Sequence, residues 1–527
     1  MFNRNADSEQ WTSGGRLVAY DGGPRSGFGS SIAFVGSSAW IGAPGVDGGK
    51  GALYQFNKAD DSNAWAGVTK VAGPERTESA QFAATMAVGQ NVAVAGLVGA
   101  DYGAGTAAIM ELDNNNNQWA VASTVFSKSD VLQPITGDKV ECTDGKASHF
   151  GCKNVNMLSF LPNDAIGADR GVNLNDLWGW TDPKTGKEYA LVGRMDGTSF
   201  VDVSNPTNPV FVATLPKPDS SDASVWRDVK VYKNHAYVVA DNAGKHGMQV
   251  LDLTKLRDYN GSPMTLEAET NYDQIHSAHN VVINTDTGFA YAVGSSGGGK
   301  TCGGGLHMIN IQDPTNPTFA GCFSDPSTGR SGTGYTHDAQ CVKYHGPDEQ
   351  YQGNEICIGA NETAISIADV TDKENPKALS TASYPDYGYV HQGWLTENHR
   401  YFFQNDELDE LMGNVDRTRT LIWDVSDLDD PQFVREFYFD NNSSDHNLYI
   451  KGNTMYQSNY VSGLQVVDVS DPENPVKTGS FDTEPFGKDE AGFAGTWSNY
   501  PYFDSGIIIM TSGSEGLFIL KKQDQEL

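Results

Sequence analysis

The sequence predicts an all-β protein: a seven-bladed β-propeller, preceded by a segment of two or so further β blades. Glycine (58 residues) and proline (22 residues) separate short runs rich in Val, Ile, Tyr, Phe and Thr, a pattern typical of strands joined by turns. No apolar pattern with helical spacing lasts for three turns. One strand-and-turn unit recurs through much of the 527-residue chain, which is too long for a single ordinary core.

The recurring unit is a strand that contains Asp or Asn near its end and runs into a turn. Six copies are FVDVSNPTNP (200–209), VLDLTKL (250–256), MINIQDPTNP (308–317), IADVTDKENP (367–376), IWDVSDLDDP (422–431) and VVDVSDPENP (466–475), and LFIL (517–520) begins a seventh. The Asp or Asn side chain is expected to bond the turn backbone, and proline then stops strand pairing because it lacks an N–H donor. The mean spacing of about 50 residues is typical of a four-stranded blade.

Each repeat is interpreted as four strands, A to D, with the recurring unit as strand C. Seven stretches are predicted to open the A strands: NDLWGW (175), RDVKVY (227), HNVVIN (279), HDAQCV (337), HQGWLT (391), HNLYIK (446) and WSNYPY (497). One sheet cannot bury both of its faces, whereas seven sheets stacked around an axis can. An open solenoid is the alternative, and the truncated last unit favours closure against the first.

The N-terminal segment repeats differently, so residues 1–140 and 141–527 are predicted to be separate domains. Aromatic residues recur 54 positions apart: Trp11, Trp65 and Trp119, and again Phe28 and Phe82. The FG at 28–29 and the GAP at 42–44 resemble FG-GAP repeats, the blade units of integrin-type propellers. Of that family's calcium loop only Asp47 and Asp101 are present. Two units are too few to close a ring, so they are expected to pack on the main propeller or a partner, or to have lost blades upstream.

The C-terminal region carries long stretches such as NDLWGWTDPKTGKEYALVGRMDGTSFVDV, YTHDAQCV and DHNLYIKGNTMYQSNYVSGLQVVDVSDP. Through them about 380 residues resemble the choice-of-anchor B family, which is built of LVIVD-type repeats. The resemblance implies a secreted or surface-attached bacterial β-propeller whose attachment device varies between members. It implies little about activity.

The net charge of −31 disfavours nucleic acid and anionic membranes as partners, because an acidic surface repels phosphate groups. No run of 18 apolar residues is present, so no membrane span is expected. The start, MFNRNADSEQW, lacks the apolar core of a signal peptide and is interpreted as the start of an already trimmed, secreted chain. Expected partners are therefore a surface glycan, a protein or matrix; the oligomeric state is left open.

The six cysteines fall into three pairs that are close in sequence: Cys142 with Cys152, Cys302 with Cys322, and Cys341 with Cys357. The last pair lies in two strands predicted to be antiparallel neighbours. Such pairs favour disulfides and an oxidising compartment, with buried free thiols as the alternative.

Four histidines occupy equivalent positions in four consecutive A strands. In a propeller the A strands line the central channel, so the openings should form a ring at one mouth. That ring comprises Asn175, Arg227, His279, His337, His391, His446 and Trp497. Successive side chains of a strand alternate, so a ring residue and its successor are not both expected to point into the channel.

Imidazole is a common ligand of zinc, iron and copper, so His279, His337, His391 and His446 are the candidate ligands of one transition-metal ion. At the level of fold, the arrangement resembles the four-histidine iron centre of carotenoid-cleaving propeller enzymes. Residues expected to support the site or line its mouth are Asp176, Arg227, Asp228, Asn280, Asp338, Gln392, Asn447, Trp497, Glu362, Asp406 and Glu407. The alternative is that each imidazole bonds a backbone carbonyl of the next blade and binds nothing.

Other motifs leave further alternatives open. The acidic stretch NDELDE (405–410) has ligands for calcium but no EF-hand spacing, and a solvated loop is the alternative. Arg227 either steadies an anionic ligand or pairs with Asp176. The glycines of SSGGGKTCGGG (295–305) are expected to form a loop and not a phosphate site, because no helix follows, and no organic cofactor is predicted. The favoured function is a binding or scaffold module; a metal-dependent enzyme with oxidative or hydrolytic chemistry is the alternative.

Overall fold

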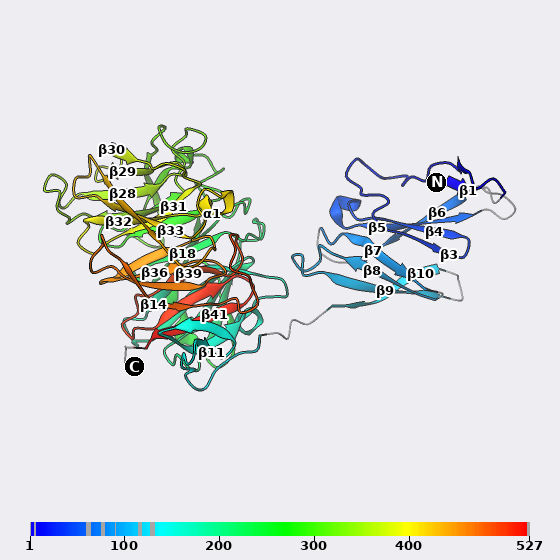
Figure 1. Ribbon diagram of the computed structural model, residues 1–527, viewed down its shortest axis with the longest axis horizontal. Coiled ribbons are helices and arrows are strands. Elements are labelled where there is room, and N and C mark those ends of the chain that lie inside the picture. The colour runs from blue at the N-terminus through cyan, green and yellow to red at the C-terminus, as the bar shows by residue number, and fades with distance from the viewer. Residues whose placement is uncertain are drawn as a thin grey trace. The chain divides into compact units, whose positions relative to one another are not determined.

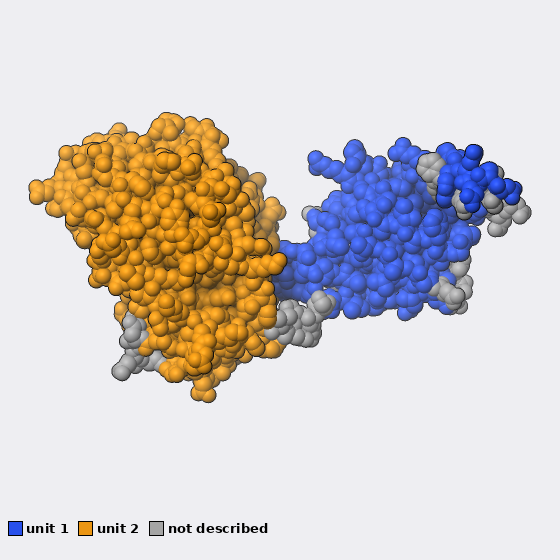
Figure 2. Space-filling view, in the orientation of Figure 1, with its two compact units in different colours: residues 1–131, 169–172 blue, residues 132–168, 173–527 orange. Residues whose placement is uncertain are grey.

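The computed structural model describes residues 2–4, 7–58, 65–74, 79–89, 91–113, 118–126 and 132–523. The chain divides into two compact units, residues 1–131 with 169–172 and residues 132–168 with 173–527, which Figure 2 colours separately. Both units are built of strands, as expected for an all-β protein, and the strands pair antiparallel except where residues 213–214 pair in parallel with residues 264–265. Among the described residues no helix is both long and apolar enough to cross a membrane.

The N-terminal unit contains two four-stranded meanders, one for each of the two repeats seen in the sequence. The first comprises β3 (Ile32–Val35), β4 (Ser38–Ala43), β5 (Ala52–Lys58) and β6 (Trp65–Ala72), with a 3-10 turn, η1 (Asp47–Gly49), between β4 and β5. The second comprises β7 (Phe82–Val88), β8 (Val92–Leu97), β9 (Thr106–Asp113) and β10 (Gln118–Val125). A separate pair joins β1 (Phe2–Arg4) to β2 (Trp11–Ser13). Trp40 and Trp119 pack edge to face with ring centroids 4.7 Å apart in the core of this unit.

Residues 132–523 form seven sheets, each referred to below as a blade (Figure 1). From the innermost strand outwards, the first blade comprises β14 (Leu174–Thr181), β15 (Glu188–Arg194), β16 (Gly197–Asp202), β17 (Val210–Pro216) and β21 (Met264–Thr265), and the second comprises β18 (Arg227–Tyr232), β19 (His235–Ala240), β20 (Met248–Asp252) and β22 (Thr270–Tyr272). The third comprises β23 (Asn280–Asn284), β24 (Phe289–Val293), β25 (Leu306–Asn310) and β26 (Thr318–Phe323), the fourth β27 (Asp338–Lys343), β28 (Glu355–Ala360), β29 (Ile365–Asp369) and β30 (Lys377–Ala382), and the fifth β31 (Val390–Leu395), β32 (Tyr401–Asp406), β33 (Arg419–Asp424) and β34 (Gln432–Tyr438). The sixth comprises β35 (Leu448–Lys451), β36 (Thr454–Ser458), β37 (Leu464–Asp468), β38 (Val476–Phe481), β12 (Phe150–Lys153) and β11 (Lys146–Ala147), and the seventh β39 (Thr496–Tyr500), β40 (Ile508–Ser512), β41 (Gly516–Lys522) and β13 (Val155–Pro162). Short helical segments are η2 (Asn163–Ile166), η3 (Leu253–Asp258), η4 (Cys302–Gly304) and α1 (Asp409–Met412).

The innermost strands form a closed ring around the channel. Each of β14, β18, β23, β27, β31, β35 and β39 contacts the next, and β39 contacts β14. Seven apolar clusters fill the spaces between consecutive blades, one cluster to each space. Each blade therefore buries both faces against its neighbours, which confirms the propeller architecture that the repeats predict.

The ring is closed by a strand from the N-terminal side of the propeller. β13 pairs with β41 from Val155 opposite Lys522 to Pro162 opposite Gly516 and becomes the outer strand of the last blade. β12 pairs with β38 of the preceding blade. The truncated repeat at residues 517–520 is thus completed by residues that precede the first A strand.

The Asp or Asn of the recurring unit bonds the turn as predicted. In all six units its side chain accepts a hydrogen bond from the backbone N–H two residues later, at 2.9–3.0 Å: Asp202, Asp252, Asn310, Asp369, Asp424 and Asp468. Strand C ends at this Asp or Asn in each of the six blades.

The three predicted cysteine pairs are disulfides in the structure, and no cysteine of the chain is free. Cys341 and Cys357 are directly opposite each other in β27 and β28. This confirms the pairing that was expected from the spacing.

Candidate metal centre at one end of the channel

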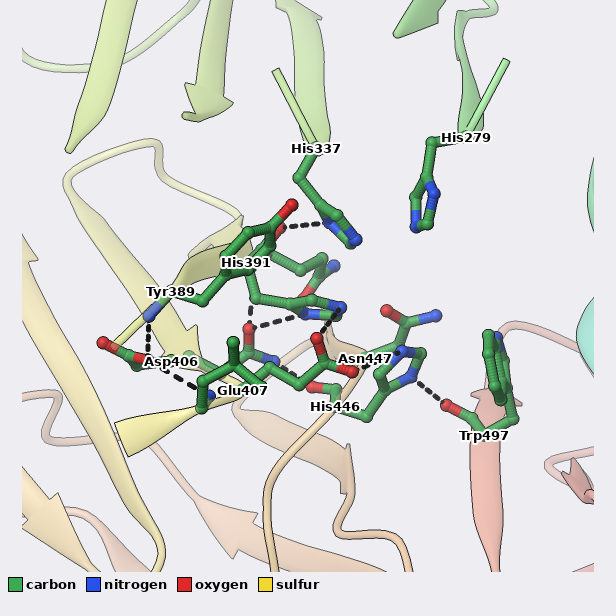
Figure 3. A network of polar contacts seen from close by, with 12 residues as sticks. His279, His337, Tyr389, His391, Asp406, Glu407, His446, Asn447 and Trp497 are labelled. Atoms are coloured by element: carbon green, nitrogen blue, oxygen red, sulfur yellow. Dashed lines mark hydrogen bonds and ion pairs between the residues drawn. The ribbon is translucent and has the colours of Figure 1, made fainter. Parts of the chain in front are cut away.

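Four imidazoles lie side by side where the A strands begin, at what is called the His end of the channel (Figure 3). The ring centroids are 4.1 Å apart for His279 and His337, 4.1 Å for His337 and His391, and 4.5 Å for His391 and His446. Trp497 continues the row, 4.9 Å from His446. Two imidazoles that bind one ion through Nε2 at a right angle would have centroids about 4.5 Å apart, given metal–nitrogen bonds of about 2.1 Å. The observed spacing fits such an arrangement.

A β-bulge lets the ring residue and its successor share the channel. The pairing of β31 with β32 skips His391, so that Val390 faces Asp406 and Gln392 faces Asn405. The pairing of β39 with β40 skips Trp497 in the same way. The strict alternation expected from the sequence is therefore wrong at these positions, because a bulge inserts one residue and redirects its side chain.

Every Nδ1 atom of the four histidines faces an oxygen. Nδ1 lies 2.9 Å from Asp241 Oδ2 in His279, 2.9 Å from the His391 carbonyl oxygen in His337, 3.1 Å from Asn405 Oδ1 in His391, and 2.5 Å from the Trp497 carbonyl oxygen in His446. Carbonyl and amide oxygens only accept, so Nδ1 is the protonated nitrogen where they are the partner. A neutral ring then has its lone pair on Nε2, the arrangement found in histidines that bind metals.

Burial keeps the rings of His337, His391 and His446 neutral by lowering their pKa values. It lowers the pKa of His391 to about 3 and that of His446 to about 3, and it lowers the pKa of His337 well below its usual value, with neighbouring imidazoles adding to the effect. His391 is fully buried, and its Nε2 has no hydrogen-bond partner among the described residues. A buried nitrogen lone pair without a donor is a costly feature that a bound cation would relieve.

Glu407 supplies a carboxylate between two of these rings. Its Oε2 lies 3.9 Å from His391 Nε2 and its Oε1 lies 3.8 Å from His446 Nε2. The Tyr460 hydroxyl donates to Glu407 Oε1 at 2.5 Å and orients the group. Among the described residues, His391, Glu407 and His446 form the one trio of potential ligands whose atoms all lie within 4.8 Å of one another.

The space at the His end is small. A cavity of about 10 Å³ lies among Trp226, Arg227, His279, Asn280, His337, His446, Asn447 and Trp497. That volume admits about one water molecule or one ion, and no organic substrate.

The residues that follow the ring positions connect neighbouring blades. Asn280 Nδ2 donates to the His337 carbonyl at 3.0 Å, and Gln392 Nε2 donates to the Leu448 carbonyl at 3.0 Å. Asn447 Nδ2 lies 3.2 Å from Ser498 Oγ and 3.2 Å from Asp176 Oδ2. These side chains form a second layer that holds the A strands together next to the imidazoles.

Three aspartates of that layer surround one lysine. Lys230 Nζ lies 2.5 Å from Asp228 Oδ1 and also interacts electrostatically with Asp176 and Asp338. Burial raises the pKa of Asp176 to about 7 and that of Asp338 to about 7. The cation beside Asp176 is therefore Lys230.

The predicted pairing of Arg227 with Asp176 is wrong. Arg227 Nε donates to the Arg194 carbonyl at 2.8 Å, and its Nη1 lies 2.7 Å from His246 Nε2. The guanidinium is fully buried between blades, where the backbone carbonyl and a neutral histidine are nearer than any carboxylate of the channel.

The stretch NDELDE is not a solvated loop. Asn405, Asp406, Asp409 and Glu410 are buried, and Glu407 is half-buried. Asp406 accepts hydrogen bonds from the Tyr384 hydroxyl and from the backbone N–H groups of Gly388 and Tyr389, so it fixes the loop that leads into His391. Glu362, which was grouped with these acids, accepts from the Arg330 backbone N–H at 2.7 Å.

Sequence reasoning missed Asn405, which orients His391, and Lys230, which neutralises the aspartates. Asn405 opens the acidic stretch, where the sequence alone indicates only a loop. Lys230 stands three residues after a ring position, where four other blades have Trp or Tyr. A lysine at a position that is otherwise aromatic is the sequence signal that could have identified it.

The opposite end of the channel, referred to as the aromatic end, encloses a cavity of about 490 Å³. Its lining includes five aromatic residues, Trp178, Trp394, Tyr449, Tyr500 and Tyr502, and the polar residues Lys230, Asp338 and Gln340. A second histidine pair, His345 and His399, lies at this end with ring centroids 3.8 Å apart.

The glycine-rich stretch at residues 295–305 contains the 3-10 turn η4 and leads directly into strand β25.

Comparison with known proteins supports the repeat. The LVIVD repeat family model matches residues 187–215 and 446–483. No curated protein matches the chain. Similar solved structures include a protein from Lactobacillus plantarum (11% identity, TM-score 0.40, covering 64% of this chain and 88% of that one). The β-propeller domain of Cps50 (Swd1) from Myceliophteria thermophila is also similar (11%, 0.42, 66% and 96%). So is the extracellular domain of a putative one-component system from B. thetaiotaomicron (11%, 0.41, 100% and 61%).

Proposed function

We propose that this chain is an extracellular binding module whose propeller holds one first-row transition-metal ion, zinc, iron or copper, at the His end. The observation that carries the proposal is the set of four imidazoles with Nδ1 directed at oxygen, two of them flanking the Glu407 carboxylate. Neutral imidazole nitrogen and carboxylate are ligands that such metals prefer. His391 and His446 with Glu407 form the nearest set, and His337 and His279 lie beside it.

The size of the site favours a binding role over catalysis. The cavity beside His279, His337 and His446 has room for an ion but for no organic substrate, and three of the four imidazoles are at most 5% exposed. In such a closed site the ion stabilises the protein.

The face that carries the His end is suited to binding a partner. Large apolar side chains are exposed on the connections that meet there: Trp226, Tyr387, Leu411, Met412, Phe486 and Phe493. Exposed apolar groups of this kind often mark interaction sites. The partner is proposed to be a glycan, a protein or matrix at the cell surface.

The extracellular assignment is supported by the three disulfides, which are typical of oxidising compartments. Membership of the choice-of-anchor B family, and FG-GAP-like blades in residues 1–140, are proposed on the quoted sequence stretches alone.

The test is metal content measured by mass spectrometry after the protein has been stripped with chelator and reloaded. One equivalent is expected in the wild type and in the control His399→Ala, whose imidazole lies at the aromatic end. His391→Ala and His446→Ala are expected to lose at least nine tenths of it. Equal content in all four proteins would contradict the proposal. Turnover of an organic substrate by the loaded wild type, lost in the same two variants, would instead favour the metal-dependent enzyme.

A further inference from the structure

The cavity at the aromatic end is lined by two kinds of residue that come from different parts of the ring of inner strands. Its five aromatic residues belong to β31, β35, β39 and β14 or lie just after β39, and these strands follow one another around the ring. The other inner strands, β18, β23 and β27, contribute Lys230, Val282, Asp338 and Gln340. The aromatic and the polar groups therefore occupy different arcs of the channel wall.

The aromatic rings hold one another in place by edge-to-face contacts. Trp394 and Tyr449 have ring centroids 5.0 Å apart and planes at 74°, and Trp178 and Tyr500 have centroids 5.0 Å apart and planes at 66°. Four of the five rings are half-buried: Trp178, Trp394, Tyr500 and Tyr502. Rings fixed in this way offer a ligand preformed apolar surfaces, so little conformational entropy is lost when the ligand stacks on them.

Two polar side chains of β27 have hydrogen-bonding capacity that the described residues do not use. Gln340 Oε1 accepts from the Leu395 backbone N–H at 2.7 Å, which fixes the amide and leaves the two N–H groups of Nε2 available. Asp338 Oδ1 accepts from the Ala339 backbone N–H at 2.7 Å, which leaves Oδ2 available. Asp338 and Gln340 lie two residues apart in a strand without a bulge, so they share one face. A donor beside an acceptor matches a hydroxyl group, which both accepts and donates.

The charges of the cavity favour a neutral ligand. Lys230 Nζ lies 4.7 Å from the centroid of the Trp178 ring, where a ligand cation would otherwise make a cation–π contact. The charged side chains of the lining are of both signs: Lys230, Lys343, Asp286, Asp338 and Glu397. Because these charges nearly balance, the cavity offers no strong field to an ion of either sign.

We propose that the aromatic end binds a neutral sugar of one or two pyranose units. The C–H groups on one face of a pyranose carry partial positive charge and pack on the negative face of an aromatic ring, while its hydroxyl groups suit Gln340 and Asp338. The volume of about 490 Å³ lies within the range of about 300–1,000 Å³ that is typical of small-molecule sites. Lys343 and Glu397 line the cavity and are exposed, so a ligand can enter from solvent.

This site goes beyond the proposed function, because it lies at the other end of the channel from the four histidines and needs no metal. The experiment is calorimetric titration of the chelator-stripped full chain with glucose, galactose, mannose, xylose, maltose, cellobiose and lactose. At least one of these sugars is expected to bind with a Kd of about 1 mM or below, that is, with about 4 kcal/mol or more. Since the protein is free of metal, the result does not depend on whether the His end binds an ion.

Two variants test the two parts of the site. Trp394→Ala removes a stacking surface, and Gln340→Glu keeps the oxygen that accepts from Leu395 but replaces the two N–H donors. Each is expected to weaken sugar binding at least tenfold, and Gln340→Glu preserves the shape of the side chain, so it tests the site even where Trp394→Ala does not fold. Phe433→Ala is the matched control, because it removes an exposed aromatic ring from β34, the outer strand of the blade that carries Trp394.

The control should bind sugar as the wild type does. Failure of the wild type to bind any of the seven sugars would overturn the proposal, as would equal binding in the wild type and Gln340→Glu. Binding of choline by the wild type, without binding of any sugar, would also overturn it and would assign the cavity to cations.

Discussion

The two ends of the propeller channel are built from the same seven strands but have opposite chemistry. The His end carries four imidazoles around a space of about 10 Å³, whereas the aromatic end opens into about 490 Å³. Three residues after each ring position, the same strands place Trp178, Lys230, Val282, Gln340, Trp394, Tyr449 and Tyr500. One end can therefore hold an ion and the other has room for a larger molecule.

The difference between the two ends shows that the position of a residue along the A strand decides which part of the channel its side chain reaches. In β31 and β39 the bulge brings both the ring residue and its successor to the channel, and the normal period of two then returns the third residue after the ring to the same side. Strand β31 thus contributes the imidazole of His391, the amide of Gln392 and the indole of Trp394 to three successive layers. Changes in one layer should leave the others intact if the layers are independent.

The largest expected effect comes from the charged layer that separates the two ends. Burial would lower the pKa of Lys230, but Asp228, Asp176 and Asp338 outweigh it and raise that pKa. Lys230→Met would leave these acids without a cation, so the free energy of unfolding should fall by about 3–5 kcal/mol. Urea denaturation measures this, with Lys343→Met, which lines the same cavity, as the control. If Lys230→Met lowered the free energy of unfolding no more than Lys343→Met does, the aspartates would need no cation.

A smaller effect is expected at the aromatic end. Trp178 packs against Tyr449, Tyr500 and Tyr502, with centroid distances of 5.7, 5.0 and 6.3 Å. Trp178→Ala should lower the free energy of unfolding by about 2–3 kcal/mol, since the side chain is half-buried. Its metal content should equal that of the wild type. Loss of metal in this variant, detected by mass spectrometry, would show that the two ends are coupled.

The smallest effect concerns a turn on the aromatic side. Hydrogen bonds from Arg257 at 2.9 and 2.6 Å hold the pKa of Asp182 below its ordinary value, and Thr185 contributes a further bond. A carboxyl with a lowered pKa stabilises the native state above about pH 4, its unfolded value, and this contribution is lost as the pH falls through the folded pKa. Asp182→Asn should therefore melt lower than the wild type at pH 7, with the gap narrowing below pH 4. A gap that stays constant with pH would be inconsistent with this role.

The fold could be predicted because its determinants repeat. The Asp or Asn that bonds each turn, the strand spacing and the cysteine pairs are local features, and six copies of a unit make the pattern visible. Closure by β13 was only implied by the missing last strand, since Val155–Pro162 lies far from β41 in sequence and carries no copy of the unit.

The site could be predicted in part. The four histidines share a repeat position, so their convergence follows from the fold. The fold does not determine which acid faces these histidines. Within NDELDE the chain turns into α1, so Asp406, Glu407 and Glu410 point in different directions. The partner of Arg227 was missed for a similar reason: a hydrogen bond to the Arg194 carbonyl involves an atom that every residue has, so no sequence pattern marks it.

The pairing of β13 with β41 also sets an order of events during synthesis. Residues 155–162 leave the ribosome early, but β41, the strand with which they pair, is synthesised some 350 residues later. Until β39, β40 and β41 have been synthesised, β13 has no partner strands and the ring of blades cannot close. During that time the apolar strand β13 is exposed to incorrect pairing with other strands.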